Sequence, residues 1–196
     1  MFVINPCAAG CGRLAITGTN LCFIHHAKPE EETERICAYI NQNKIINDLC
    51  VAGMRFENTD FSNHQFDGCN FRDASFIKCK LTGSKITASF FDFAEFNECD
   101  FSKSDIQFIS FAGGHFNKCC FEGCELIHVN YEGTTVSEST FDNSNLYNSR
   151  FISADLEKTT FINCNLKRVY FYSAKRSDIN FKSSNTAEAL FEMEEE

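Results

Sequence analysis

Basic residues and long apolar runs are scarce in this sequence, and their scarcity excludes several classes of protein. Lys and Arg number 18 against 27 Asp and Glu, so the net charge is −9 and argues against bulk attraction to nucleic acid or to an anionic membrane. No stretch of 18 apolar residues is present, so no transmembrane helix is predicted. The opening "MFVINPCAAG" lacks a basic region followed by an apolar one, so no signal peptide is expected. Twelve cysteines without such a signal indicate a reducing, cytoplasmic location.

Signatures of catalysis are also missing. The sequence contains no P-loop, no G-x-G-x-x-G, no G-x-S-x-G and no H-E-x-x-H motif. Three histidines lie outside the N-terminal region: His64, His115 and His128. The repeat described next places His64 inward and the other two outward, without a patterned Cys or carboxylate partner. The chain is therefore not expected to be an enzyme.

What the sequence has in abundance is phenylalanine, 22 residues of it, and these recur with a fixed period. From Val51 to Phe171 every fifth residue is large and apolar, with no insertion, and the pattern returns at Phe181 after Arg176. The residue two places earlier is generally small, as at Ala74. Residues two apart on an extended segment share a face, so each unit of five points one small and one large side chain inward. The remaining positions are polar or turn-prone and form a corner.

Laps of 20 residues sort these positions into columns of like side chains, whereas laps of 15 mix them. One column is nearly all aliphatic: Phe66, Ile86, Ile106, Leu126, Leu146 and Leu166. One column of small residues is Thr59, Cys79, Cys99, Cys119, Ser139 and Thr159. The pattern predicts an all-β solenoid with four sides and about six coils. Stacked phenylalanines would fill its interior and leave no cavity for a substrate.

Units such as "SADLEKTTFINCNL" resemble the pentapeptide-repeat family over roughly residues 51–181. The resemblance implies the family fold, a right-handed quadrilateral β-helix. At ~4.8 Å between stacked strands, six coils give a rod about 30 Å long. Some members of the family imitate the size and charge of duplex DNA and protect or inhibit gyrase-type topoisomerases.

The chain divides into a Cys/His head (1–28), a capping helix and linker (29–50), the β-helix (51–181) and a C-terminal helix with an acidic tail (182–196). A helix is expected near 30–42, because Pro29 suits a first helical position and Ile36, Tyr39 and Ile40 share a face. A second short helix is expected from Asn185, which has Glu188 at capping-box spacing. These helices would cover the open coil ends. Leu190 and Phe191 could instead form a homodimer contact.

The head reads "CAAGCGRLAITGTNLCFIHH" and has the spacing of a metal site. Cys7 and Cys11 form one pair, and Cys22 and His25 form another, with His26 as an alternative to His25. Two close pairs separated by a short hairpin suit a tetrahedral structural Zn²⁺, and so small a segment needs such a staple. The arrangement resembles small zinc-binding hairpins appended to bacterial and phage proteins. The alternative is four reduced side chains packed against the capping helix.

Two functions from different classes remain open. The first is a non-catalytic protein-binding or scaffold protein with no nucleic-acid or membrane partner, since a preorganised solenoid surface binds without an ordering cost. The second is a DNA mimic that acts on a gyrase-type topoisomerase. Residues 86–149 carry ten acids and two bases, a net −8, which favours mimicry; residues 150–182 carry seven bases and three acids, a net +4, which weakens it. The unbroken phase of the repeat also leaves no inserted loop. Nucleic-acid binding through the head is disfavoured, because residues 1–50 carry four bases and five acids.

Overall fold

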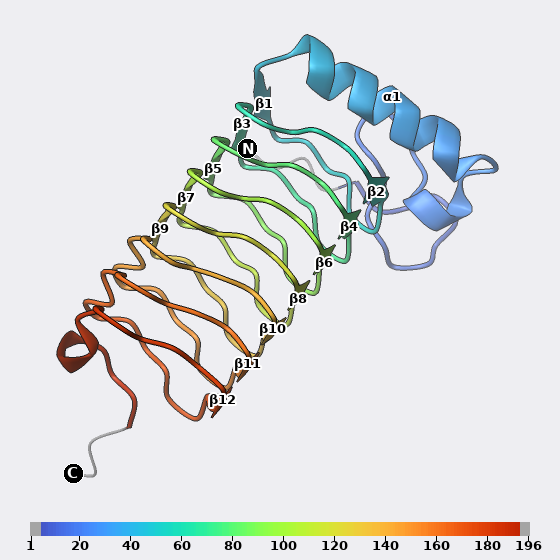
Figure 1. Cartoon of the computed structure of the whole chain (residues 1–196). Coiled ribbons are helices and arrows are strands. Elements are labelled where there is room, and N and C mark those ends of the chain that lie inside the picture. The colour runs from blue at the N-terminus through green and yellow to red at the C-terminus, as the bar shows by residue number, and fades with distance from the viewer. Residues whose placement is uncertain (1–4, 193–196) are drawn as a thin grey trace.

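The computed structural model describes residues 5–192 as an elongated rod of stacked coils with one helix at its N-terminal end (Figure 1). Helix α1 spans Pro29–Gln42, and two single 3-10 turns, η1 and η2, span Phe23–His25 and Thr186–Glu188. The strands have three residues each: β1 Ile45–Asn47, β2 Arg55–Glu57, β3 Gln65–Asp67, β4 Ser75–Ile77, β5 Lys85–Thr87, β6 Glu95–Asn97, β7 Asp105–Gln107, β8 His115–Asn117, β9 Glu125–Ile127, β10 Thr135–Ser137, β11 Asp155–Glu157 and β12 Lys175–Ser177.

Paired strands are parallel and twenty residues apart in register, as where Ile45 lies opposite Gln65. Strands β1, β3, β5, β7 and β9 form one sheet, and the other seven form a second in the order β12-β11-β10-β8-β6-β4-β2. The two remaining sides of each coil carry isolated parallel bridges of the same spacing, such as Asn70 with Phe90. The four-sided all-β solenoid expected from the sequence is therefore confirmed.

The solenoid has about seven turns, where the sequence predicted about six. Ile46 already occupies an inward, fully buried position on β1, five residues before Val51. At the other end the Phe191 ring stacks on that of Phe171, with centroids 5.1 Å apart. The estimate from the sequence was short because it counted only the unbroken run of large apolar residues.

Aromatic side chains fill the axis of the rod. Rings twenty residues apart stack nearly parallel: the centroids of Phe96 and Phe116 lie 4.8 Å apart with 5° between planes. Rings from opposite sides of a coil meet edge to face, as Phe141 and Phe151 do at 88°. Both arrangements suit the quadrupole of the ring. The core is therefore continuous and packed with side chains from end to end.

The small inward side chains satisfy backbone groups that would otherwise be buried without a partner. Ser144 Oγ donates to the Phe121 carbonyl oxygen at 2.6 Å and accepts from the Cys124 N–H at 2.9 Å. Cys119 Sγ donates in the same way to the Phe96 carbonyl. Within residues 5–192, two buried side-chain atoms lack a hydrogen-bond partner, His64 Nε2 and Tyr131 Oη. Ser, Thr and Cys thus suit the small position because they are compact and can donate a hydrogen bond.

Every corner from Asp48 to Ser183 has one residue in the left-handed region of backbone space. Six of these residues are glycines: Gly53, Gly68, Gly83, Gly113, Gly123 and Gly133. The others are mostly Asn, Asp, Lys and Ser, and they include Phe93 at φ 60° and Phe108 at φ 54°. A left-handed residue turns the chain sharply after each large inward side chain. Polar corners were predicted, but the left-handed conformation was not.

Helix α1 forms over the expected residues and covers the first coil, with Ile36 and Ile40 both buried. Tyr39 was expected on the same buried face, and this was wrong: it is 42% exposed. None of the helices within residues 5–192 is long and apolar enough to cross a membrane.

The C-terminal end differs from the expected helix. Only the three-residue turn η2 forms, because Asn185 Oδ1 accepts a hydrogen bond from the Leu166 N–H at 2.6 Å instead of capping a helix. Leu190 pairs with Tyr170 as a further rung of the coil. The expected acidic tail falls mostly on residues 193–196, which lie outside the described part of the chain.

Candidate metal centre

The head is a short hairpin closed by tight turns. Pro6 bridges Leu14 in antiparallel fashion, and the Cys7 N–H donates to the Arg13 carbonyl. Gly10 and Gly12, on either side of Cys11, have φ of 72° and 78°, which allows the chain to reverse around Cys11. The hairpin therefore brings Cys7 and Cys11 to the same side of the head.

The remaining pair is positioned by η1. This single turn begins after Cys22, and the His25 N–H donates to the Cys22 carbonyl oxygen at 3.0 Å. This turn folds the imidazole back over the thiol. His25 Nδ1 then lies 3.3 Å from Cys22 Sγ and 3.4 Å from Cys7 Sγ.

Four ligand atoms meet in this head. The ligand atoms of Cys7, Cys11, Cys22 and His25 all lie within 4.8 Å of one another, and the Sγ atoms of Cys11 and Cys22 are 3.6 Å apart. A tetrahedral Zn²⁺ with Zn–S bonds of about 2.3 Å requires sulfur atoms about 3.8 Å apart. The donor set and its spacing therefore fit zinc with four protein ligands.

Hydrogen bonding favours a thiolate in this cluster. The backbone N–H of Cys22, 3.3 Å from Cys7 Sγ, is the main cause that lowers the pKa of Cys7 to about 6. Burial instead raises the pKa of Cys22. A thiolate is the form that binds metal, so the first cysteine is prepared for a cation.

His26 is directed away from the cluster. Its Nε2 lies 3.2 Å from both Thr19 Oγ1 and the Leu21 carbonyl oxygen, and its Nδ1 lies 3.7 Å from a Glu32 carboxylate oxygen of α1. The ring thus connects the hairpin to the helix. Of the two histidines proposed from the sequence, the fold places His25 among the sulfur atoms.

The head is attached to the first coil of the rod. Ile16 is buried in the same core as the phenylalanines. The Thr17 N–H donates to the Cys50 carbonyl, and Thr17 Oγ1 accepts from the Cys50 N–H. Arg35 of α1 donates to the Thr17 carbonyl oxygen at 2.8 Å. The head and α1 therefore cover the N-terminal opening together.

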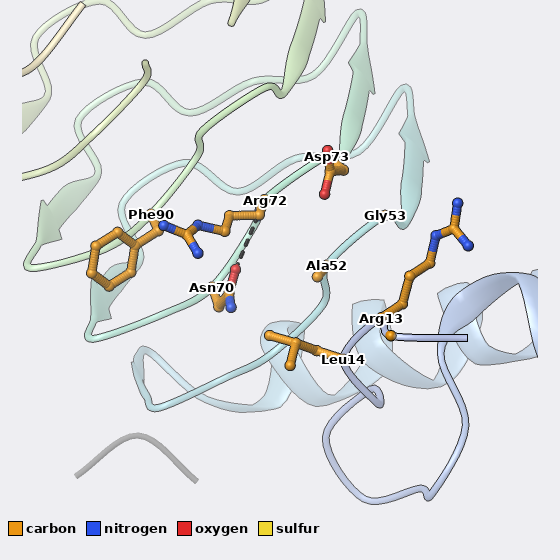
Figure 2. A pocket seen from close by; sticks show the side chains of 9 residues that line it. Arg13, Leu14, Ala52, Gly53, Asn70, Arg72, Asp73 and Phe90 are labelled. Atoms are coloured by element: carbon orange, nitrogen blue, oxygen red, sulfur yellow. Dashed lines mark hydrogen bonds between the residues drawn. The ribbon is translucent and has the colours of Figure 1, made fainter. Parts of the chain in front are cut away.

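A pocket of about 550 Å³ lies between the head and the neighbouring side of the rod (Figure 2). Arg13 and Leu14 form one wall and Arg72 part of the other, with the Arg72 guanidinium lying 5.1 Å from the centre of the Phe90 ring. Arg72 also donates to Asp92 Oδ2 at 2.8 Å. The lining holds no histidine, cysteine, serine or lysine, so it does not assemble a nucleophile with a base.

The remaining histidines lie where the repeat predicts. His64 is buried and its Nδ1 lies 3.0 Å from the Ser62 carbonyl oxygen, whereas His115 and His128 are exposed. His128 stacks on Phe108, a contact that no sequence motif indicated. Phe93 and Phe108 are 64% and 62% exposed. Both phenylalanines fall outside the five-residue period of inward side chains. This was the only feature of the sequence that indicated their exposure.

Two family models match the chain: a pentapeptide repeat region over residues 114–191 and pentapeptide repeats over residues 55–87. No curated protein sequence is a significant match.

Similar solved structures include a trypsin-treated variant of QnrB1, a plasmid-mediated fluoroquinolone resistance protein. It is 19% identical, with a TM-score of 0.55, over 72% of this chain and 82% of that one. HetL from the cyanobacterium Nostoc, involved in heterocyst differentiation regulation, is 10% identical with a TM-score of 0.36, over 81% and 93%. A pentapeptide repeat protein of the Arabidopsis thaliana thylakoid lumen is 22% identical with a TM-score of 0.36, over 51% and 66%. At these identities the similarity concerns the fold alone. With its five-residue period, four-sided coils and two matching family models, the chain belongs to the pentapeptide-repeat proteins.

Proposed function

We propose that this protein is a non-catalytic binding rod that presents its outer sides to a protein partner. The observation that carries the proposal is the filled axis, where side chains such as Phe101 and Phe121 stack 4.5 Å apart and are fully buried. A substrate therefore has no interior site. Rigid solenoid sides are ordered before binding, so binding carries little cost in conformational entropy.

The Cys/His cluster supports a structural role for Zn²⁺ in this rod. Cys7, Cys11, Cys22 and His25 would hold the ion and complete a four-ligand set with no open position for a substrate. The bound ion would stabilise a hairpin too small to have its own core. Since the hairpin covers the first coil, the metal would stabilise the cap and protect the coil edge from pairing with other chains.

Action on a gyrase-type topoisomerase is a second candidate, and the net −8 of residues 86–149 favours it. The acids are distributed around the rod, with Asp105 and Glu125 on one sheet and Glu95 on the other. Supercoiling by gyrase, measured with increasing amounts of this protein, tests it: DNA-competitive inhibition or protection supports mimicry, and no effect at micromolar protein removes it.

The binding function is tested by photo-crosslinking the full-length protein to its partners in lysate of the native host. A matched bait is the same protein after thermal unfolding. The proposal expects one or a few proteins captured only by the folded bait, and no turnover of a broad substrate panel. Turnover without a specific captured partner contradicts it.

A further inference from the structure

One side of the rod carries exposed aromatic rings on corner residues. Phe108 and Gly113 are consecutive corners of one coil, and Phe93 is the corner one lap before Gly113. We call this surface the Phe93–Phe108 face. It comprises Phe93, Phe108, Ser110, Ala112, Gly113, His128 and Glu132.

Two observations set these rings apart from the other side chains of the rod. Phe93 and Phe108 are among the most exposed large apolar side chains within residues 5–192. Both also occupy left-handed backbone positions, at φ 60° and 54°, which a bulky residue rarely adopts. Neither burial nor backbone preference accounts for phenylalanine at these corners.

The rings are supported from beneath and bordered by a flat surface. A side chain at Gly113 would approach to 2.5 Å of Phe93, so the ring lies directly over that glycine. The Phe108 ring stacks on His128 with centroids 4.9 Å apart, and Asn148 donates to His128 Nδ1 at 2.6 Å. Between the two corners the outward side chains are only Ser110 and Ala112. The corners at Phe108 and Gly113 are five residues apart, so at most about 18 Å separates them. A bound extended segment of about five residues is long enough to cover this distance.

The charge of this face indicates the chemistry of its occupant. Glu132 is exposed and makes no ion pair within the described residues 5–192. Asp92, in contrast, is paired with Arg72. Residues 86–149 wind around this face and the other three sides of the rod, and their net charge of −8 attracts a basic segment to this part of the rod as a whole. Aromatic faces and a free carboxylate together attract a cation with a flat apolar surface, which describes the guanidinium of arginine.

We propose that the Phe93–Phe108 face binds an arginine-containing basic segment of a partner protein, with a guanidinium stacked on an exposed phenyl ring and paired with Glu132. This inference rests on the proposed binding function and names the surface and the class of partner. Arginine is favoured over lysine because its guanidinium is planar and more weakly hydrated.

Titration of the full-length protein with nona-arginine and nona-lysine peptides tests the inference. Wild type should bind nona-arginine more tightly than nona-lysine. The double variant Phe93→Gly/Phe108→Gly should bind nona-arginine about five- to tenfold more weakly and lose the preference. Glu132→Gln should weaken binding about two- to threefold. Glycine suits both backbone positions, so the double variant should remain folded.

The matched control is Asn58→Gly/Asn63→Gly, at two exposed left-handed corners away from this face. It should bind nona-arginine as wild type does. Equal loss in this control, unchanged binding by the phenylalanine variant, or equal affinity for both peptides would each overturn the inference. Light scattering that shows a wild-type dimer converted to a monomer by Phe93→Gly/Phe108→Gly would also overturn it, because the occupant would then be a second copy.

The crosslinking experiment separates this inference from the function on which it rests. A partner captured equally by wild type and by Phe93→Gly/Phe108→Gly overturns the assignment of the face and leaves the binding function intact. A partner that the double variant loses and the asparagine control retains, and whose crosslinked segment contains arginine, supports both. Capture of nothing by folded wild type removes the binding function itself.

Discussion

At the residue scale, the five-residue period predicted which side chains point inward and could not predict the backbone conformation of the corners. Large apolar residues report burial directly, so positions such as Phe96 followed from the sequence. The corner residues have no common chemistry: Gly133, Ala88 and Lys103 all adopt a left-handed backbone. Because the fold imposes that conformation, no single residue type signals it.

Substitutions at two corners should change stability in opposite directions. Ala88→Gly should raise the free energy of unfolding by about 1 kcal/mol, because Ala88 is exposed at φ 48° and glycine has no left-handed penalty. Gly133→Ala should lower it by a similar amount, since a Cβ there meets nothing within 4 Å and only the backbone is affected. Urea denaturation measures both. If both substitutions changed the free energy of unfolding in the same direction, the left-handed backbone conformation assigned to Ala88 and Gly133 would be contradicted.

Tyr131 is the one tyrosine in the inward columns of large residues, and its hydroxyl group lacks a hydrogen-bond partner within residues 5–192. Burial raises its pKa well above the usual range. Tyr131→Phe should therefore stabilise the protein by about 1 kcal/mol, since it removes an unpaired polar atom and keeps the ring stacked between Phe111 and Phe151.

The converse change, Phe141→Tyr, is the control for Tyr131→Phe. It places a hydroxyl group in an equally buried column and should destabilise the fold. A loss of stability in Tyr131→Phe would mean that its hydroxyl group has a partner, such as an ordered water, in the core.

At the scale of the element, the ligand spacing of the head predicted the four candidate ligands but left two histidines open. The choice depends on η1, which turns His25 back toward Cys22, and on the contacts that hold His26 near Thr19 and Glu32. Adjacent residues point in different directions, and no spacing rule distinguishes them. Likewise, Asn185 and Glu188 have capping-box spacing, but Asn185 bonds to the preceding coil, so the expected helix shortens to a single turn.

Metal content should follow the assigned ligands. Wild-type protein purified without added zinc should contain about one Zn²⁺ per chain. The variant Cys11→Ser should contain almost no zinc, whereas His26→Gln should contain as much as the wild type. Elemental analysis measures this. Since the ion would staple only the head, chelation should unfold the hairpin and leave the far-ultraviolet circular dichroism of the coils largely unchanged. Equal loss of metal in both variants would contradict the assignment of His25.

Columns of buried thiols should make the solenoid sensitive to high pH. Burial raises the pKa of Cys69 and Cys124 to about 12 and that of Cys164 to about 11. A thiol pKa raised by folding gives stability that is complete below the unfolded value near 9 and is lost as pH rises toward the folded value. The free energy of unfolding should fall by at least about 1.4 kcal/mol per pH unit from pH 9.5 to 10.5.

Urea denaturation at several pH values measures this slope. Cys124→Ser should make it shallower, because one of the titrating thiols is removed and serine already fills the equivalent position in neighbouring coils, at Ser104 and Ser144. A stability that stays constant over this range would show that the thiols are solvated.

At the scale of the whole molecule, the sequence predicted a solid rod and the fold confirms its architecture, while its partner depends on the outer surface. The inward pattern of one small and one large side chain recurs in every coil and carries no information about a partner. Such information lies in departures from the pattern, including Phe93 and Phe108 at exposed corners. Arg176 is another departure: it is in register with the buried Leu156 but is itself exposed, and its guanidinium lies 4.8 Å from the centre of the Phe191 ring.

The most direct test of the account is a high-resolution crystal structure of the full-length protein that locates ordered solvent. The account predicts phenylalanine columns in van der Waals contact from the first coil to the last, with no water or ligand between them. A chain of ordered waters or a bound molecule along the axis would contradict the filled core, and with it the conclusion that only the outer sides of the rod bind.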